Sequence, residues 1–97
     1  MRVVLTNAAE EELTAIYAFY AGRSGSDDRV IGAILKAITG LASFPLMGRP
    51  GDTPGTRERI VTRYPYRIVY HIDETNQVVA VWRVVHSARQ WPLAGDD

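Results

Sequence analysis

The segment from Arg57 to Pro92 constrains the fold more than any other, because its pattern predicts three consecutive antiparallel strands. In residues 66–72 every second side chain is large and apolar, which predicts one packed face and one wetter face. Residues 78–86 carry apolar side chains on both faces, as expected of a central strand. The polar run between these two strands predicts a short hairpin loop, and Pro65 ends the strand that precedes them.

Two amphipathic helices are predicted before these strands. In the first, Asn7 is the expected N-cap with Glu10 three residues later, and an apolar stripe follows. The stripe consists of Leu13, Ile16, Tyr17 and Tyr20. The second helix is expected to begin at the Ser26-Asp27-Asp28 cap and to end at Phe44-Pro45. Its apolar face consists of Val30, Ile31, Ile34, Leu35, Ile38 and Leu41.

Residues 2–6 are β-branched and apolar, and they predict a first strand ahead of the helices. The expected fold class is therefore α+β, a two-layer domain in the order strand–helix–helix–strand–strand–strand. The helical hairpin would pack on a mainly antiparallel four-stranded sheet. A chain of 97 residues has room for one core, so we expect a single domain over residues 1–97.

The composition excludes several classes of function. The chain has no cysteine and two histidines, so neither a metal site nor a bound cofactor is expected. Its formal net charge is zero, which disfavours a protein that depends on non-specific binding to nucleic acid. No apolar run is long enough to span a membrane, and no leader is recognisable, so we expect a soluble cytoplasmic protein.

Three motifs in order resemble those of the RelE/ParE family of bacterial toxins. They are FPLMGRPG at residues 44–51, YRIVY at 66–70 and VVHSARQWP at 84–92. The resemblance implies the toxin of a type II toxin–antitoxin module, held inactive by a cognate antitoxin in a hetero-oligomer. RelE-like members of the family cut messenger RNA on the ribosome, whereas ParE-like members inhibit DNA gyrase.

The residues present favour the ParE-like branch, which inhibits gyrase by binding and is not an enzyme. RelE-like toxins use lysines on the second strand, arginines on the third strand and after the fourth, and a tyrosine near the C-terminus. Here the arginines are Arg67 and Arg89, but Glu58 and Ile60 occupy the lysine positions and no tyrosine follows Tyr70. Two alternatives stay open: a RelE-like messenger RNA endonuclease on the ribosome, and a non-toxic protein-binding module.

The target-binding residues that the resemblance implies are Arg67, His86, Arg89 and Trp91. In an RNase, Arg67, His86 and Arg89 would be catalytic, since a histidine near neutral pKa can transfer protons. Each residue also has a structural explanation. The two arginines would be ion-paired to Glu58 or Asp73, His86 would bond to backbone, and Trp91 would pack on the sheet edge.

Overall fold

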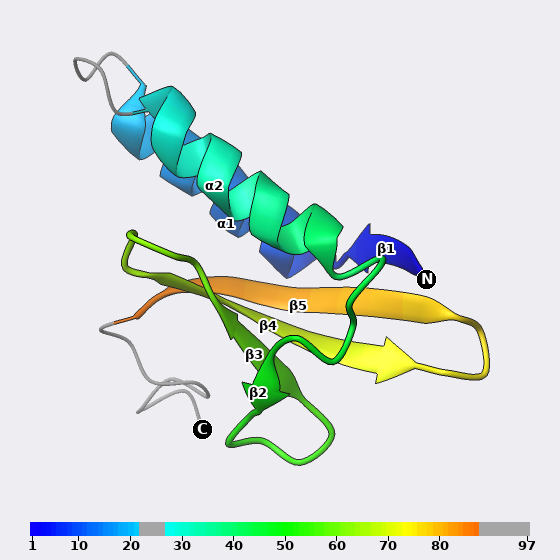
Figure 1. Cartoon of the computed structure of the whole chain (residues 1–97). Coiled ribbons are helices and arrows are strands. Elements are labelled where there is room, and N and C mark those ends of the chain that lie inside the picture. The colour runs from blue at the N-terminus through cyan, green and yellow to red at the C-terminus, as the bar shows by residue number, and fades with distance from the viewer. Residues whose placement is uncertain (22–26, 88–97) are drawn as a thin grey trace.

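The computed structural model describes residues 1–21 and 27–87, and it places two helices on one face of a five-stranded sheet (Figure 1). The strands lie in the order β1-β5-β4-β3-β2. The elements are β1 (Arg2–Leu5), α1 (Asn7–Tyr20), α2 (Asp27–Gly40), β2 (Arg49–Pro50), β3 (Arg57–Ile60), β4 (Tyr66–Asp73) and β5 (Val78–His86). Neither helix of the described ranges is long and apolar enough to cross a membrane.

The predicted α+β fold is confirmed, but the prediction of four strands is wrong. The additional strand is β2, two residues that pair antiparallel with β3 at the edge of the sheet. A two-residue strand containing a proline has no periodicity to detect, and proline is confined to edge positions of this kind. The sheet is mixed because β1 runs parallel to β5, whereas the other neighbouring strands are antiparallel.

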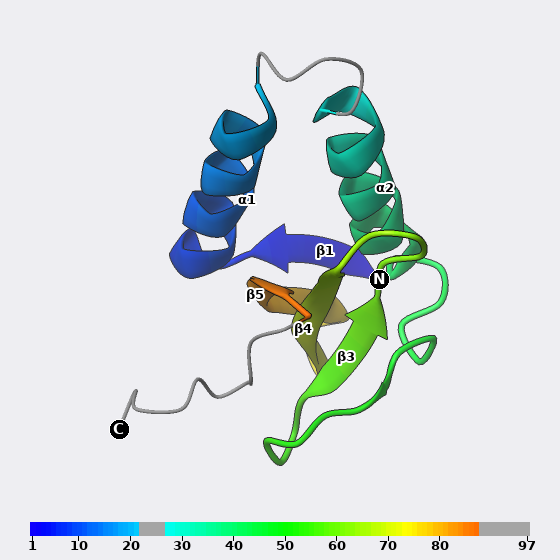
Figure 2. The same cartoon turned by 90° about the vertical axis from the view of Figure 1, so that its left-hand side faces the viewer.

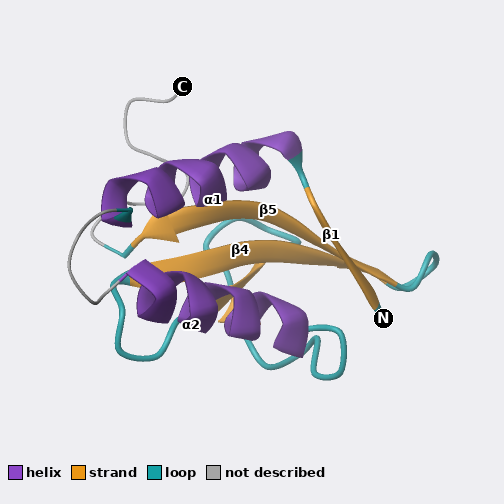
Figure 3. Cartoon of the chain, turned by 90° about the horizontal axis from the view of Figure 1, so that it is seen from above, coloured by secondary structure: helices purple, strands orange, loops and turns teal. Residues whose placement is uncertain are grey.

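The two helices form a layer over the middle of the sheet, with α1 above β5 and α2 above β4 (Figures 2 and 3). Between the layers lies a core whose largest fully buried side chains include Ile34, Leu41, Ile68, Tyr70 and Val81. The predicted apolar stripes are mostly correct. Two members are wrong, since Tyr17 is 55% exposed and Leu35 is 45% exposed.

Thr6, between β1 and α1, continues the hydrogen bonding to β5 beyond the end of β1. Thr6, and not Asn7, is the N-cap, and its hydroxyl accepts a hydrogen bond from the Ala9 amide (3.2 Å). The same hydroxyl donates to the Trp82 carbonyl (2.8 Å), and the Thr6 amide donates to the Val81 carbonyl (3.0 Å). Because the Thr6 hydroxyl bonds to both α1 and β5, it fixes the direction in which α1 leaves the sheet.

A β-bulge interrupts the alternation of β5. Tyr70 pairs with Val81, but Val69 pairs with Arg83, so Trp82 is an extra residue on β5. The bulge brings Val84 back to the core face, whereas strict alternation placed it on the face opposite Val81. Trp82 is half-buried and stacks on His71, with ring centroids 5.6 Å apart.

Candidate functional site

Arg67 lies on the sheet face that points away from the helices. It is ion-paired with Glu58 on β3, Nη1 to Oε1 at 3.6 Å, which confirms the structural pairing considered for this arginine. The Glu58 side chain is only 3% exposed and that of Arg67 12%. The second carboxylate oxygen, Oε2, accepts from the Asp52 amide at 3.5 Å, so this buried acid also holds the loop after β2. Arg67 is thus part of a largely buried charged cluster.

Val69, next to Arg67 on the same face, is fully buried, although the alternation predicted a wetter surface. Its cross-strand neighbours are Glu58 and Arg83, whose side chains are long. This face therefore packs apolar and charged side chains together, and its Val69, Glu58 and Arg67 are largely shielded from solvent.

His86 ends β5 on the opposite face of the sheet, the face covered by the helices. It pairs across the ladder with Tyr66, and the two rings meet edge to face with centroids 5.4 Å apart. The Tyr66 hydroxyl lies 3.3 Å from that of Tyr20 on α1. Burial, followed by this hydrogen bond, raises the pKa of Tyr66 from 10.0 to about 12. His86 therefore borders a tyrosine pair in a cavity of about 540 Å³ beside α1.

The raised pKa of Tyr66 leads to a testable alkaline instability. Between pH 10 and 12 the unfolded phenol loses its proton while the folded one keeps it, so stability falls as pH rises through this range. We expect the unfolding free energy to fall by up to about 2 kcal/mol more in the parent protein than in Tyr66→Phe. Urea unfolding at pH 9 and pH 11.5 measures the difference; parallel losses in both proteins would contradict it.

Glu12 of α1 secures the end of β5 near His86. Its Oε2 accepts two hydrogen bonds from Arg83, at 2.9 Å from Nε and 2.6 Å from an Nη atom. Its Oε1 accepts the Val84 amide at 2.9 Å, next to the bulge. Because β1 pairs with β5 only as far as Val81, the Val84 amide has no partner on β1, and the Glu12 carboxylate accepts its hydrogen bond instead.

The structure does not bring the predicted site residues together. Arg67 and His86 leave the sheet on opposite faces, and strand alternation causes this, since their ladder partners are Val85 and Tyr66. Arg89 and Trp91 lie outside the described residues. Among the described residues no group of His, Cys, Asp or Glu side chains is arranged to hold a metal ion.

The loop between α2 and β2, which carries the first family motif, is held by buried hydrogen bonds. The Tyr70 hydroxyl donates to the Pro45 carbonyl (2.6 Å) and accepts from the Gly48 amide (2.9 Å). The Arg57 guanidinium donates to the carbonyls of Leu46 and Gly48. Gly48 is required here, because a Cβ atom would lie 2.6 Å from the Tyr70 hydroxyl and 2.7 Å from the Glu58 carbonyl oxygen.

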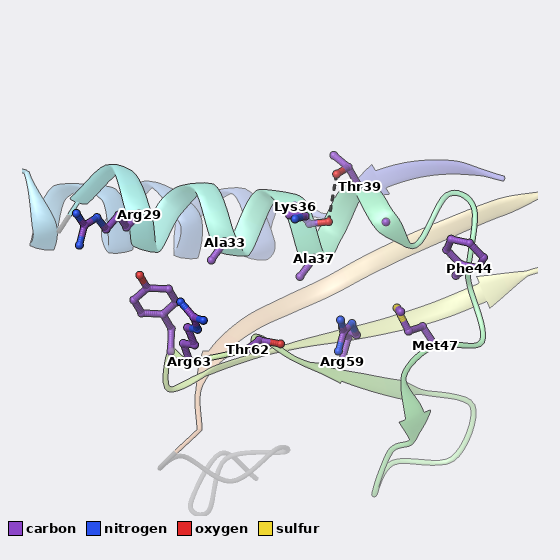
Figure 4. Close-up of a pocket in the computed structure, with 12 residues that line it drawn as sticks. Arg29, Ala33, Lys36, Ala37, Thr39, Phe44, Met47, Arg59, Thr62 and Arg63 are labelled. Atoms are coloured by element: carbon purple, nitrogen blue, oxygen red, sulfur yellow. Dashed lines mark hydrogen bonds between the residues drawn. The ribbon is translucent and has the colours of Figure 1, made fainter.

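Despite these fixed contacts, the loop exposes large apolar side chains to solvent. Phe44, Leu46 and Met47 are 64%, 68% and 57% exposed. Phe44 and Met47 border a groove that also contains four cations, and sequence reasoning did not identify this surface (Figure 4). The cations lie on α2 and around the end of β3, so only the tertiary structure brings them together.

Comparisons with known proteins agree with this architecture. The family model described as "ParE toxin of type II toxin-antitoxin system, parDE" matches residues 3–91. Y4kP of Sinorhizobium fredii, a protein named as a toxin, is 38% identical over 64 residues. That match covers 66% of this chain and 64% of Y4kP, slightly less than two thirds of the relative's length.

Solved structures share the fold over nearly the whole chain. The chromosomal ParDE system from P. aeruginosa gives a TM-score of 0.76 at 22% identity, over 89% of this chain and 95% of that chain. The toxin–antitoxin complex RelBE2 from Mycobacterium tuberculosis gives 0.65 at 26% identity, over 88% and 95%. The arrangement of two helices on a mixed sheet is therefore common to both structures.

Proposed function

We propose, on the premise that this chain belongs to the ParE toxin family of type II toxin–antitoxin systems, that it arrests growth by binding DNA gyrase and blocking its activity. On this proposal the chain is not an enzyme. It recognises a protein target in the cytoplasm, and a cognate antitoxin holds it inactive in a hetero-oligomer. Solved relatives that are toxin–antitoxin complexes support such a partner.

The observation that carries the proposal is the separation of Arg67 from His86. RNA cleavage needs a proton-transfer group and phosphate-binding cations within hydrogen-bond reach of one phosphate. Here Arg67 is paired with the buried Glu58 on one face, and His86 borders Tyr66 on the other. That arrangement favours a surface that binds a protein over an RNA-cleaving centre among the described residues.

The target contacts that we propose are Arg67, His86, Arg89 and Trp91. Arg89 suits a charge-assisted, bidentate contact with a carboxylate of a protein partner, whereas Arg67 would have to exchange Glu58 for such a contact. Trp91 would supply an aromatic anchor of the kind that dominates protein interfaces. His86 is the residue that discriminates between the two candidate activities, because an RNase would need it for proton transfer and a gyrase inhibitor would not.

The direct test compares the two candidate targets with one purified preparation. We expect the protein to block supercoiling by purified gyrase while messenger RNA stays intact in a translating ribosome extract. Expression in cells should stop growth, and co-expression of the antitoxin should restore it. Rapid ribosome-dependent cleavage of transcripts with normal supercoiling would instead assign the chain to the RelE-like activity.

His86→Gln gives a second, independent readout. A gyrase inhibitor should keep its killing activity, because glutamine retains hydrogen-bonding capacity and His86 is exposed at the end of β5. An RNase that used His86 for proton transfer should lose roughly 100-fold or more of its activity. Killing is measured by colony counts after induction, with circular dichroism as the control for folding. Loss of killing in folded His86→Gln, with inhibition of gyrase supercoiling by the purified variant unchanged, would contradict the gyrase proposal.

A further inference from the structure

A groove of about 830 Å³ runs between α2 and the turn that follows β3 (Figure 4). Four cations line it: Arg29 and Lys36 come from α2, and Arg59 and Arg63 come from β3 and the turn after it. No carboxylate is among its lining residues. In a chain of zero net charge, this is a local concentration of positive charge.

Among the side chains that the structure describes, no carboxylate forms an ion pair with these cations. The ion pairs found there join Arg67 to Glu58 and Arg83 to Glu12, and neither involves the groove. Arg59 donates from Nη1 to the Ile60 carbonyl (3.1 Å), which is a contact with a neutral group. Like charges that share a groove repel one another, so an anionic partner would be stabilised here.

Arg63 also has a strained backbone. Its φ angle is 75°, in the left-handed region where residues with a side chain are disfavoured and glycine is not. The turn itself would be less strained with glycine at this position. Strain of this kind is found at binding sites, where the side chain contributes something that the local fold does not need.

The rim of the groove is apolar, which indicates the class of partner. Phe44 and Met47 line it with side chains that are 64% and 57% exposed, on the loop fixed by Tyr70 and Arg57. Rigidly held, exposed apolar side chains are typical of protein-binding surfaces. Nucleic acid would use the cations but not the apolar rim, and a neutral chain lacks the charge for strong backbone binding.

We propose that this groove binds a segment of the cognate antitoxin that carries acidic side chains toward the four cations and apolar side chains toward Phe44 and Met47. The inference rests on the proposed function only in that the chain has an antitoxin. It does not depend on gyrase as the target. The charge complementarity fixes the orientation of the segment, because its acidic side must face α2 and the β3–β4 turn.

The test measures the affinity of the purified full-length toxin for the full-length antitoxin by calorimetry. The double variant Lys36→Glu/Arg63→Glu reverses charge on both sides of the groove, and Arg2→Glu/Arg49→Glu reverses two exposed arginines outside it. We expect the groove variant to bind at least about tenfold more weakly, with a flatter salt dependence, and the control to stay within about twofold. In cells, the groove variant should kill but escape neutralisation.

Three results would overturn this proposal. One is unchanged antitoxin affinity in the folded groove variant. Another is an equal loss of affinity in the control variant, which would mean that overall charge and not the groove matters. The third is a groove variant that loses binding to a short DNA duplex but still binds the antitoxin, which would identify a nucleic-acid site. Because binding is measured with antitoxin alone, failure of the gyrase assay would leave this test unaffected.

Arg63→Gly separates the charge of the groove from the stability of the turn. Glycine suits the left-handed φ of 75°, so the thermal midpoint should stay equal to that of the parent protein or rise. Antitoxin affinity should nevertheless fall by about threefold or more, as expected for loss of one charged contact at an interface. Unchanged affinity in this folded variant would remove Arg63 from the site and contradict the argument from strain.

Discussion

Gly48→Ala is expected to lower the free energy of unfolding by about 3 kcal/mol. The added Cβ would lie 2.6 Å from the Tyr70 hydroxyl and 2.9 Å from the Glu58 carbonyl carbon, and backbone cannot rotate out of the way. Relief requires the loop to move from β3, which would break the hydrogen bonds of the Tyr70 hydroxyl with Pro45 and Gly48. The thermal midpoint should fall by roughly 10 °C or more in a domain of this size.

Gly32→Ala is the matched control for this change. Gly32 lies in α2, and a Cβ there would meet nothing within 4 Å. Alanine should therefore stabilise the helix by about 0.5–1 kcal/mol. Thermal unfolding of both variants should give shifts of opposite sign, and equal shifts would show that the close packing around Gly48 has no energetic importance.

Glu58→Leu is expected to destabilise the protein by about 3 kcal/mol, since it removes the buried carboxylate that pairs with the mostly buried guanidinium of Arg67. It also removes the acceptor of the Asp52 amide, so the loop after β2 should become more open to proteolysis. Urea unfolding gives the free energy, and limited proteolysis reports on the loop. A loss below about 0.5 kcal/mol would mean that the pair behaves as an exposed surface ion pair.

The double variant Glu58→Leu/Arg67→Met distinguishes a structural role of Arg67 from a role in target recognition. Replacing both members of a buried pair by apolar residues is often close to neutral, so most of the lost stability should return. If Arg67 also contacts gyrase, this folded double variant should still fail to block supercoiling. Full inhibition would assign Arg67 a structural role alone.

Much of the fold follows from local pattern. The alternation in residues 66–72 correctly placed Ile68 and Tyr70 in the core, because the extra residue of the bulge lies on β5 and β4 keeps its alternation. The same reasoning failed for residues 83–86, because a bulge changes the face of every following residue and the sequence carries apolar side chains on both faces. It also ended α2 at Phe44-Pro45, whereas the helix ends at Gly40.

The candidate site was less accessible to sequence reasoning than the fold. Glu58 was visible as a departure from the lysine that the resemblance to RelE-like toxins implies, but its burial and its bond to the Asp52 amide were not. The groove cations Arg29 and Arg63 are distant in the chain and become neighbours only when α2 packs over β4. Long-range packing of this kind has no local signal in one sequence.

The pairing of β1 with β5 also determines when the protein can fold during synthesis. Among the strands that the structure describes, β1 comes first in the chain and has its ladder partner in β5, which comes last and lies between β1 and β4. Contacts between residues so far apart in sequence form slowly, and here they cannot form at all until the last strand has been synthesised. A nascent chain therefore lacks a complete sheet through most of its translation, and its unpaired strand edges stay exposed until β5 has emerged.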